Sequence, residues 1–507
     1  MKSKRSGMFR AVLRCVCAVV ILALAVAISY WRTSQQDALL RQSDVQKVEA
    51  TCTSNGYTLL TNRETGETTM IQIVPAKGHS FGQWETRNEN ATVGCTPRVR
   101  SCLICGWEEN GADYEDLGIA RLSLYGSLEG IGKMESVDLT AEFEDQEQGI
   151  SFQSYATLKH QGHSSLGYSK KNFTLKFFED ENCTVKNKLT FSHWNKEHKY
   201  ILKANYIDPS QSRNLVCADI WAEICASRSS MPDEMRGLSN YGAVDGFPIA
   251  VYLNDQFLGL YTMNLHKDDD LFGMEDGERQ AIMICNVPGT QEAEFRGEAE
   301  FSDDSSWEVE FCGTEDDGWA KQKLNELIRF VMTSDDDLFR AELGNYLDVD
   351  GAIDYLLTTY ALGLTRHGSK DLVLVNYGSI WIPSHYDMED AFGLLADGSG
   401  AYDAEEFLPF RTDEGWTSAT ENLLWDRLLN CFEDEIAQRY AVLRETILTT
   451  DGLCGRVSQF TDMIPEDLYA ADAACYPPPA QFDAEEQMIQ YIQGRLAALD
   501  EIFLAKE

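Results

Sequence analysis

The spacing of apolar residues changes from strand-like to helix-like near Asp316, and this change limits the possible folds most. Upstream, short runs alternate apolar and polar residues, as half-buried strands do. These runs are Ala120–Tyr125, Ser151–Lys159, Asn172–Phe178 and the hairpin of Phe247–Leu253 with Gln256–Met263. The helical segments are Arg213–Ser227, Trp319–Thr333, Val349–Leu362, Asn422–Leu448 and Ala484–Ala505. We therefore predict an α+β fold with a β-rich N-lobe and a helical C-lobe.

The chain has 507 residues, which is long enough for two or three domains. Changes in amino-acid composition along the chain indicate the boundaries between its parts. The predicted parts are a signal-anchor segment (1–32), a polar stalk (33–50), a small cysteine-containing repeat module (51–110), the β-rich N-lobe (111–315) and the helical C-lobe (316–507).

The N-terminus has the features of a membrane signal. Its first 32 residues carry six basic and no acidic side chains, and an apolar run extends from Cys15 to Trp31. This run fits either an anchor that spans a membrane or a signal peptide cleaved near its alanines. The basic flank predicts that the N-terminus stays in the cytoplasm. In both cases we expect residues 33–507 outside the cytoplasm, either tethered to the cell membrane by one helix or secreted.

The exported part is strongly acidic. The formal net charge is −39 for the chain, and −45 beyond residue 32 because the first 32 residues contribute six positive charges. Such a surface repels the phosphates of nucleic acids and attracts cationic partners. We therefore expect no nucleic acid partner. Solubility alone is the simpler explanation of the charge.

The module 51–110 contains a short cysteine motif, Cys102-Leu103-Ile104-Cys105-Gly106. Two cysteines at this spacing before a glycine form the knuckle of zinc ribbons, where a tight turn points two thiolates at one metal. Cys52, Cys95 and His79 are available to complete a Zn²⁺ site. The module also resembles short repeats on exported proteins of Gram-positive bacteria, so a disulfide-stapled wall-binding or spacer module is the alternative.

The residues with the clearest chemistry are Asp371, Asn376, Asp387 and Glu389, the last two followed by Phe392-Gly393. They fall in a predicted two-stranded insert of Leu372–Tyr377 and Ser379–Ile382. An Asp, an Asn five positions later and a downstream acidic cluster have the spacing of a phosphoryl-transfer centre. Carboxylate and amide oxygens are the ligands that Mg²⁺ prefers. The spacing predicts Asp371 as a catalytic base, with Asn376 and Asp387 as metal ligands.

Six further stretches follow one another in order from about residue 115 to the end of the chain. They are Gly162-His163-Ser164-Ser165, Lys170-Lys171-Asn172-Phe173, Leu202-Lys203-Ala204 with Arg213-Asn214, Val251-Tyr252-Leu253-Asn254, Asp387-Met388-Glu389 with Phe392-Gly393, and Tyr491-Ile492 with Arg495. Together they resemble the signature of the CotH family, the spore-coat protein H kinases.

The resemblance implies an atypical, bilobal protein-kinase-like fold and an exported enzyme. Such an enzyme moves the γ-phosphoryl group of ATP, with Mg²⁺ or Mn²⁺, onto Ser or Thr of a surface or coat protein. From the acidic surface we expect an acceptor rich in Ser, Lys and Arg. The implied nucleotide-binding residues are Lys170 or Lys171, Gly162, Ser164, Ser165 and Arg213, and the implied metal ligands are Asn376, Asp387 and Glu389 or Asp390. Alternation along a strand lets only one of the two lysines face the cleft.

The chain departs from the family pattern at three positions. Gln161 stands where the family has Arg before Gly162, Glu389 replaces an Asp, and Leu265 stands where a Glu is usual. A catalytically degenerate scaffold or adhesin with a kinase-like fold is therefore the alternative function. A metal-dependent phosphoesterase would use the same acids but leaves the lysine pair unexplained.

Overall fold

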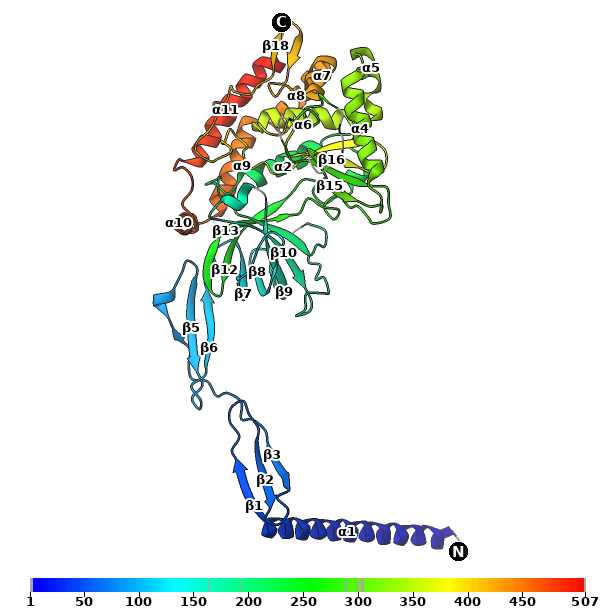
Figure 1. Ribbon diagram of the computed structural model, residues 1–507, viewed down its shortest axis with the longest axis vertical. Coiled ribbons are helices and arrows are strands. Elements are labelled where there is room, and N and C mark those ends of the chain that lie inside the picture. Colours follow the sequence, from blue (N-terminus) through cyan, green and yellow to red (C-terminus); the bar gives the residue numbers. More distant parts are fainter. Residues whose placement is uncertain are drawn as a thin grey trace. The chain divides into compact units, whose positions relative to one another are not determined.

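The computed structural model describes residues 3–162, 164–191, 193–287, 290–297, 299, 301 and 305–505 (Figure 1). The side chains of residues 3–18, 35–36, 39 and 164 are outside this description. The chain divides into two compact units. One unit comprises the residues up to Asn90 with Thr96–Asp113, and the other comprises Ala91–Cys95 with Tyr114–Glu507.

The first unit contains one long helix and two small sheets. Its elements are α1 (Ser3–Gln42), β1 (Ser43–Val48), β2 (Gly56–Asn62), β3 (Thr68–Val74), β4 (Glu85–Thr86), β5 (Cys95–Ser101) and β6 (Glu108–Tyr114). Strands β1, β2 and β3 form one antiparallel sheet in sequence order, and β4, β5 and β6 form the other. Within the described side chains, no helix is both long and apolar enough to cross a membrane. Residues 15–18, the start of the apolar run in the predicted anchor, lie outside the described side chains.

A closed barrel of seven strands forms the first part of the second unit. The strands are β7 (Ala120–Tyr125), β8 (Val137–Asp145), β9 (Ile150–Gln161), β10 (Asn172–Phe178), β11 (Lys199–Lys203), β12 (Gly246–Leu253) and β13 (Gln256–Leu265). Their order around the barrel is β10-β11-β13-β12-β7-β8-β9. Neighbours pair antiparallel except β7 and β12, which are parallel. Aromatic side chains fill the interior, among them Phe143, Phe177 and Tyr200.

A second sheet joins the barrel part to the helical part. It consists of β14 (Ala281–Cys285), β15 (Trp307–Cys312), β16 (Leu372–Asn376) and β17 (Trp381–His385), in the order β15-β14-β16-β17. Every residue of β14, β16 and β17 is buried. A short hairpin, β18 (Phe410–Thr412) with β19 (Gly415–Thr417), follows this sheet in sequence.

Helices make up most of the remaining chain. They are α2 (Arg213–Ala226), α3 (Asp233–Arg236), α4 (Gly318–Thr333), α5 (Asp336–Glu342), α6 (Val349–Leu362), α7 (Leu423–Cys431), α8 (Glu433–Thr446), α9 (Thr450–Met463), α10 (Glu466–Cys475) and α11 (Ala484–Phe503). Local chemistry sets several ends. At α6, for example, the Asp348 carboxylate accepts the Gly351 N–H at 3.2 Å, and Gly363 ends the helix in the left-handed region with φ 68°.

The mixture of helices and strands confirms the α+β prediction, and α6, β7 and β10 have the predicted bounds. The predicted helix Asn422–Leu448 is wrong as one element, because Phe432 leaves the helical region between α7 and α8. Three acidic residues then begin α8, where negative side chains favour a helix N-terminus. The predicted two-stranded insert was incomplete, since β16 and β17 belong to the four-stranded sheet.

A carboxyl pair next to β11, the buried Glu197 and the partly exposed Asp270, gives the barrel a pH-dependent stability. Burial and the hydrogen bond and charge of Asp270 raise the pKa of Glu197 to about 9. A raised carboxyl pKa stabilises the fold fully below the unfolded pKa, and this stabilisation is lost as pH rises through the folded value. Glu197→Gln keeps a donor for Asp270 but cannot ionise. We expect the unfolding free energy of this variant, measured in urea, to match wild type at pH 4, below the unfolded pKa of about 4.3, and to exceed it by about 1–2 kcal/mol at pH 8.5. The same difference at both pH values would contradict this assignment.

Candidate active site

The hairpin of β16 and β17 brings Asp371 and Asp387 to one end of the sheet. Leu372 pairs with His385 in the register, so the residues just outside this pair are neighbours. The Asp371 N–H donates to the Cys285 carbonyl at 2.9 Å and continues the ladder with β14. Both aspartates have left-handed backbones, with φ 64° at Asp371 and 58° at Asp387. Such conformations cost about 1–3 kcal/mol each in non-glycine residues and gather at functional sites.

A buried imidazole pair supports this end of the sheet. His367 and His385 are buried, and their Nδ1 atoms lie 3.0 Å apart, so one ring donates and the other accepts. The Tyr355 ring stacks on His385 with centroids 3.9 Å apart. Burial lowers the pKa of both histidines, that of His367 to about 4, which keeps both rings neutral at physiological pH. These rings hold the loop that carries Asp387 in place.

Lys203 is the last residue of β11 in the barrel. Its side chain reaches the acidic loop, which follows β17 and carries Asp387, Glu389 and Asp390. Its Nζ lies 2.5 Å from Asp387 Oδ1 and 3.3 Å from Glu389 Oε2. The lysine is only 8% exposed, so burial opposes its charge, but the two carboxylates outweigh burial and raise its pKa. Lys203 therefore carries a fixed positive charge between two acids.

The negative charge of the carboxylates exceeds the positive charge of the side chains that face them. Burial and the negative charge of Asp387 raise the pKa of Asp371 to about 7, against the opposing effect of Arg366. Burial and Asp387 likewise raise the pKa of Glu389. At Asp387, Lys203 and Arg366 overcome burial and lower the pKa. The site thus holds one firmly ionised carboxylate beside two that resist ionisation, and an added cation would favour ionisation of all three.

Two oxygens of this cluster lack a partner of their own. Asp371 Oδ2 and Asp390 Oδ1 are buried, and no described residue forms a hydrogen bond with them. Unpaired hard oxygens beside the ionised Asp387 are the donors that a divalent cation such as Mg²⁺ or Mn²⁺ uses. The residues present therefore fit the metal that the sequence predicts. Asp387 and Glu389 are the residues that would hold it, with the unpaired Asp390 Oδ1 as a further oxygen donor.

Arg366 and Lys370 supply the remaining positive charge. Arg366 Nε lies 3.0 Å from Asp390 Oδ2, and its Nη2 lies 3.8 Å from Asp371 Oδ2. Lys370 Nζ lies 3.7 Å from the same Asp371 oxygen. Both contacts with Asp371 are longer than hydrogen bonds, so this carboxylate remains available to another group.

The structure does not bring Asn376 to the position predicted for it. Residues 372–376 form an extended strand, in which five residues span about 16 Å, so Asn376 lies at the opposite end of β16 from Asp371. It pairs with Trp381 in the register, and its Oδ1 accepts the Gly378 N–H at 2.7 Å in the hairpin turn. In a kinase the corresponding Asp and Asn share a loop, which lets them meet. The prediction failed because this segment is a strand.

The two lysines predicted to bind nucleotide have other partners. Lys170 is buried, its Nζ lies 2.9 Å from Asp472 Oδ2 of α10, and it also donates to the Leu260 carbonyl. Lys171 donates to the Leu166 carbonyl at 2.7 Å and to the Tyr168 carbonyl, and so holds the preceding loop. Lys170 and Asp472 line a cavity of about 410 Å³ with aromatic walls.

The loop of the predicted nucleotide-binding residues Gly162, Ser164 and Ser165 lies next to the strand that carries Lys203. Gly162 has φ 103°, and a side chain there would meet Ser165 Oγ. The Asn172 amide donates to Ser165 Oγ at 3.3 Å, and its oxygen accepts the Ala204 N–H at 2.7 Å. Burial and the charge of Glu389 raise the pKa of the following Tyr168, which places this loop near the acidic cluster. His163 and the side chain of Ser164 lie outside the described residues.

Arg213 positions the acidic loop from the start of α2. It is fully buried, its Nε lies 3.1 Å from Asp208 Oδ1, and its Nη1 donates to the Ala391 carbonyl at 2.7 Å. Its Nη2 donates to Gln487 of α11 at 2.7 Å. The predicted nucleotide-binding arginine is therefore bound to protein groups on both sides of the loop. Glu223, farther along α2, pairs with Arg456 at 2.5 Å.

Sequence reasoning missed Lys203 and Arg366. A signal for Lys203 was present, because it is the one charged residue in the apolar stretch Tyr200–Ala204 of a barrel strand, where a lysine is costly unless it is paired. Arg366 had no comparable signal, since it lies in a polar turn between α6 and β16.

Comparison with known proteins identifies the family of the chain. The sequence model of the CotH kinase protein family matches residues 158–499, which include the barrel from the end of β9, the four-stranded sheet and nearly all of the helical part. A search of curated proteins gave no match. The match spans most of the chain and contains Lys203, Asp371, Asp387 and Glu389. The chain therefore belongs to the CotH kinase protein family.

Proposed function

We propose that this chain is an atypical protein kinase that transfers the γ-phosphoryl group of ATP to Ser or Thr of a surface or coat protein. The observation that carries the proposal is the convergence of Lys203, Asp387 and Glu389 from two different sheets. A barrel that carries the lysine and a separate sheet that carries the acids resemble the division of labour between the two lobes of a kinase.

Each residue of the cluster has a role that its environment suits. Lys203 binds phosphate oxygens as a point charge, and Asp387 and Glu389 hold the divalent ion, which neutralises charge on the phosphates when bound. Asp371, whose pKa is raised to about 7, accepts the proton of the acceptor hydroxyl. A base with a pKa near the working pH transfers protons most effectively. Arg366 and Lys370 keep this carboxylate oriented.

Charge and hydropathy support a proposal for the acceptor and the location. The formal charge of −39 favours a basic acceptor rich in Ser, Lys and Arg. Large apolar side chains are exposed along α1, including Val19, Ile21 and Leu22 at 67%, 66% and 70%. Exposed apolar surface of this size supports contact with lipid. We propose that α1 tethers the kinase to the cell membrane with its catalytic part outside the cytoplasm, or directs its secretion.

Label transfer from γ-labelled ATP tests the proposal. We expect the full chain with Mg²⁺ or Mn²⁺ to label a Ser-rich peptide containing Lys and Arg, and to label a matched peptide containing Glu much less. A chelator should abolish transfer, and added salt should weaken the preference because it screens charge. Equal labelling of both peptides would contradict the predicted acceptor but leave the kinase intact. No labelling of any acceptor, including the chain itself, would contradict the kinase.

The position of Arg366 supports a second candidate function. In this alternative the chain has a kinase-like fold that binds nucleotide without transferring phosphoryl groups. In kinases the catalytic Asp precedes the metal-binding Asn by five residues. If Asp371 takes the place of that Asn, Arg366 occupies the position of the base, and an arginine is not deprotonated in proteins. Metal-dependent ATP binding by a chain that labels no acceptor would identify this degenerate scaffold.

A further inference from the structure

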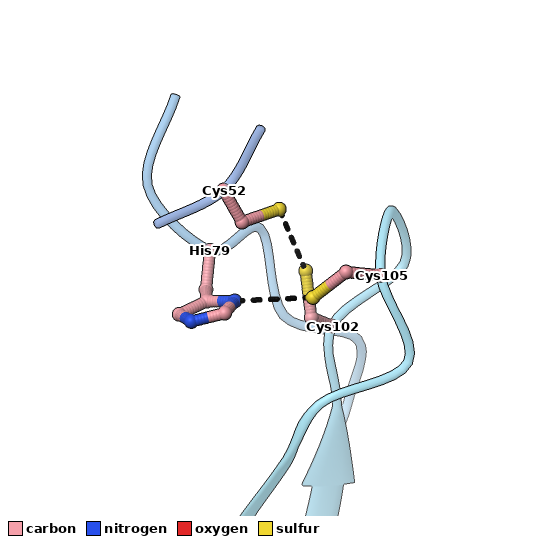
Figure 2. A group of neighbouring side chains, drawn as sticks. All are labelled: Cys52, His79, Cys102 and Cys105. Atoms are coloured by element: carbon pink, nitrogen blue, oxygen red, sulfur yellow. Dashed lines mark hydrogen bonds between the residues drawn. The ribbon is translucent and has the colours of Figure 1, made fainter. Parts of the chain in front are cut away.

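Four side chains of the first unit meet at a single point that the kinase chemistry does not use. They are Cys52, His79, Cys102 and Cys105, and one ligand atom from each lies within 4.8 Å of the others (Figure 2). They come from three separate loops: Cys52 from the loop between β1 and β2, His79 from that between β3 and β4, and the other two cysteines from the turn between β5 and β6. We propose that these four residues form a structural Zn²⁺ site.

The distances fit a tetrahedral metal centre better than a disulfide. With zinc–sulfur bonds of about 2.3 Å, tetrahedral geometry separates two sulfurs by about 3.8 Å. The Sγ atoms of Cys52 and Cys102 lie 3.8 Å apart, far beyond the S–S bond length of about 2.05 Å. On the other side, Cys105 Sγ lies 3.4 Å from His79 Nδ1. A disulfide would use two of the three thiols and leave a cysteine and a histidine without a role, whereas zinc uses all four groups.

The turn of Cys102 and Cys105 has the form of a metal knuckle. The Gly106 N–H donates to the Cys102 carbonyl at 2.8 Å, and Gly106 has φ 74°, a conformation that glycine adopts without steric cost. The backbone N–H groups of Ile104 and Cys105 point at the Cys102 sulfur. Donors of this kind stabilise a thiolate, which is the form that binds zinc. The turn therefore presents two sulfurs to one side.

The other two ligands are held by the backbone and by stacking. The Gly78 N–H donates to the Cys52 carbonyl at 3.0 Å, which ties the loop of His79 to that of Cys52. The Leu103 N–H donates to the Ser80 carbonyl at 2.8 Å and ties the same loop to the knuckle. The His79 ring stacks on Trp107, with centroids 4.8 Å apart and an interplanar angle of 20°. These contacts orient the ligands before any metal binds.

A bound metal would stabilise this unit, because several of its large apolar side chains are exposed and add little to a buried core. Apolar side chains such as Ile73, Leu103 and Trp107 are exposed at 61%, 76% and 52%. Small modules with little buried apolar surface usually depend on disulfides or metals. Three thiolates and an imidazole in a tetrahedral arrangement select zinc over harder cations. The site would add metal–ligand bonds to the backbone hydrogen bonds and ring stacking that join the three loops.

Metal content and thiol reactivity of the full chain test the site. We expect the chain, purified without chelator under reducing conditions, to hold about one zinc per molecule, and to show the visible absorption of tetrahedral thiolate-bound cobalt after exchange with Co²⁺. His79→Ala and Cys105→Ser should each lose most of the zinc. Cys183→Ser, which removes a half-buried cysteine of the barrel unit, should keep all of it.

Each outcome decides the proposal. Zinc lost in both ligand variants and kept in the Cys183 control supports the site. Zinc retained in both ligand variants, or no uptake by the reduced wild-type chain incubated with Zn²⁺, overturns it. A Cys52–Cys102 disulfide mapped by mass spectrometry of peptides, together with no zinc uptake after reduction, would assign these two cysteines to a disulfide instead. Because none of these measurements uses ATP, the result is independent of the kinase proposal.

Discussion

Asp387→Asn is expected to lower phosphoryl transfer about 100- to 1000-fold, the loss typical of removing one group that stabilises the transition state. The substitution keeps the shape of the side chain but removes the carboxylate charge that holds both the metal and Lys203. Initial rates with saturating Mn²⁺ and ATP measure the loss. Because Lys203 still faces Glu389 at 3.3 Å, the variant should fold.

A melting temperature near that of wild type would verify that Asp387→Asn folds. The matched control is Asp337→Asn, which makes the same change in an exposed residue of α5 and should leave the rate unaltered. If the folded Asp387 variant transferred phosphoryl groups as fast as the Asp337 control, Asp387 would have no part in catalysis.

Lys203→Met should have the second large effect, a loss of about 100-fold in kcat/KM for ATP. Methionine has nearly the same length but no charge, so the phosphates would lose their cation, and Asp387 and Glu389 would repel each other unopposed. Rates measured over a range of ATP concentrations separate a loss of binding from a loss of turnover.

Lys199→Met is the matched control, since Lys199 lies on the same strand and pairs with Asp268 at 3.0 Å. It should change kcat/KM by less than about twofold, as expected for a partly exposed pair away from the acidic cluster. Lys170→Met distinguishes the two candidate lysines. If Lys170→Met removed activity while Lys203→Met did not, the nucleotide would bind in the cavity beside Asp472 instead.

The sequence predicted those parts of the fold in which periodicity and burial agree. The residues of β7 and β10 alternate between apolar and polar types in sequence, and the bounds of both strands were predicted correctly. By contrast, β14 is buried on both faces, so its residues Ala281–Cys285 do not alternate and it was not predicted. Long helices with capping residues, such as α6, were placed to the residue.

The candidate site was predicted in part, because sequence order does not determine which strand ends meet. Asp371, Asp387 and Glu389 come together because β16 begins and β17 ends at the same edge of the sheet. Asn376 was included because its spacing matched a catalytic loop, yet the run Leu372–Val375 is apolar and β-branched at two of its four positions, which favours a strand. Lys203 and Arg366 reach the site through contacts between segments 184 and 24 residues apart, which no local pattern reveals.

Titration of the full chain with ATP in the presence of Mn²⁺, followed by calorimetry, tests most directly whether the converging carboxylates bind a metal–nucleotide complex. We expect saturable binding that disappears when the metal is chelated. Binding should be at least about tenfold weaker in Asp387→Asn and unaltered in Asn376→Ala, whose side chain lies in the hairpin turn. Equal binding of ATP with and without metal, or binding that depends on Asn376 and not on Asp387, would contradict the site described here.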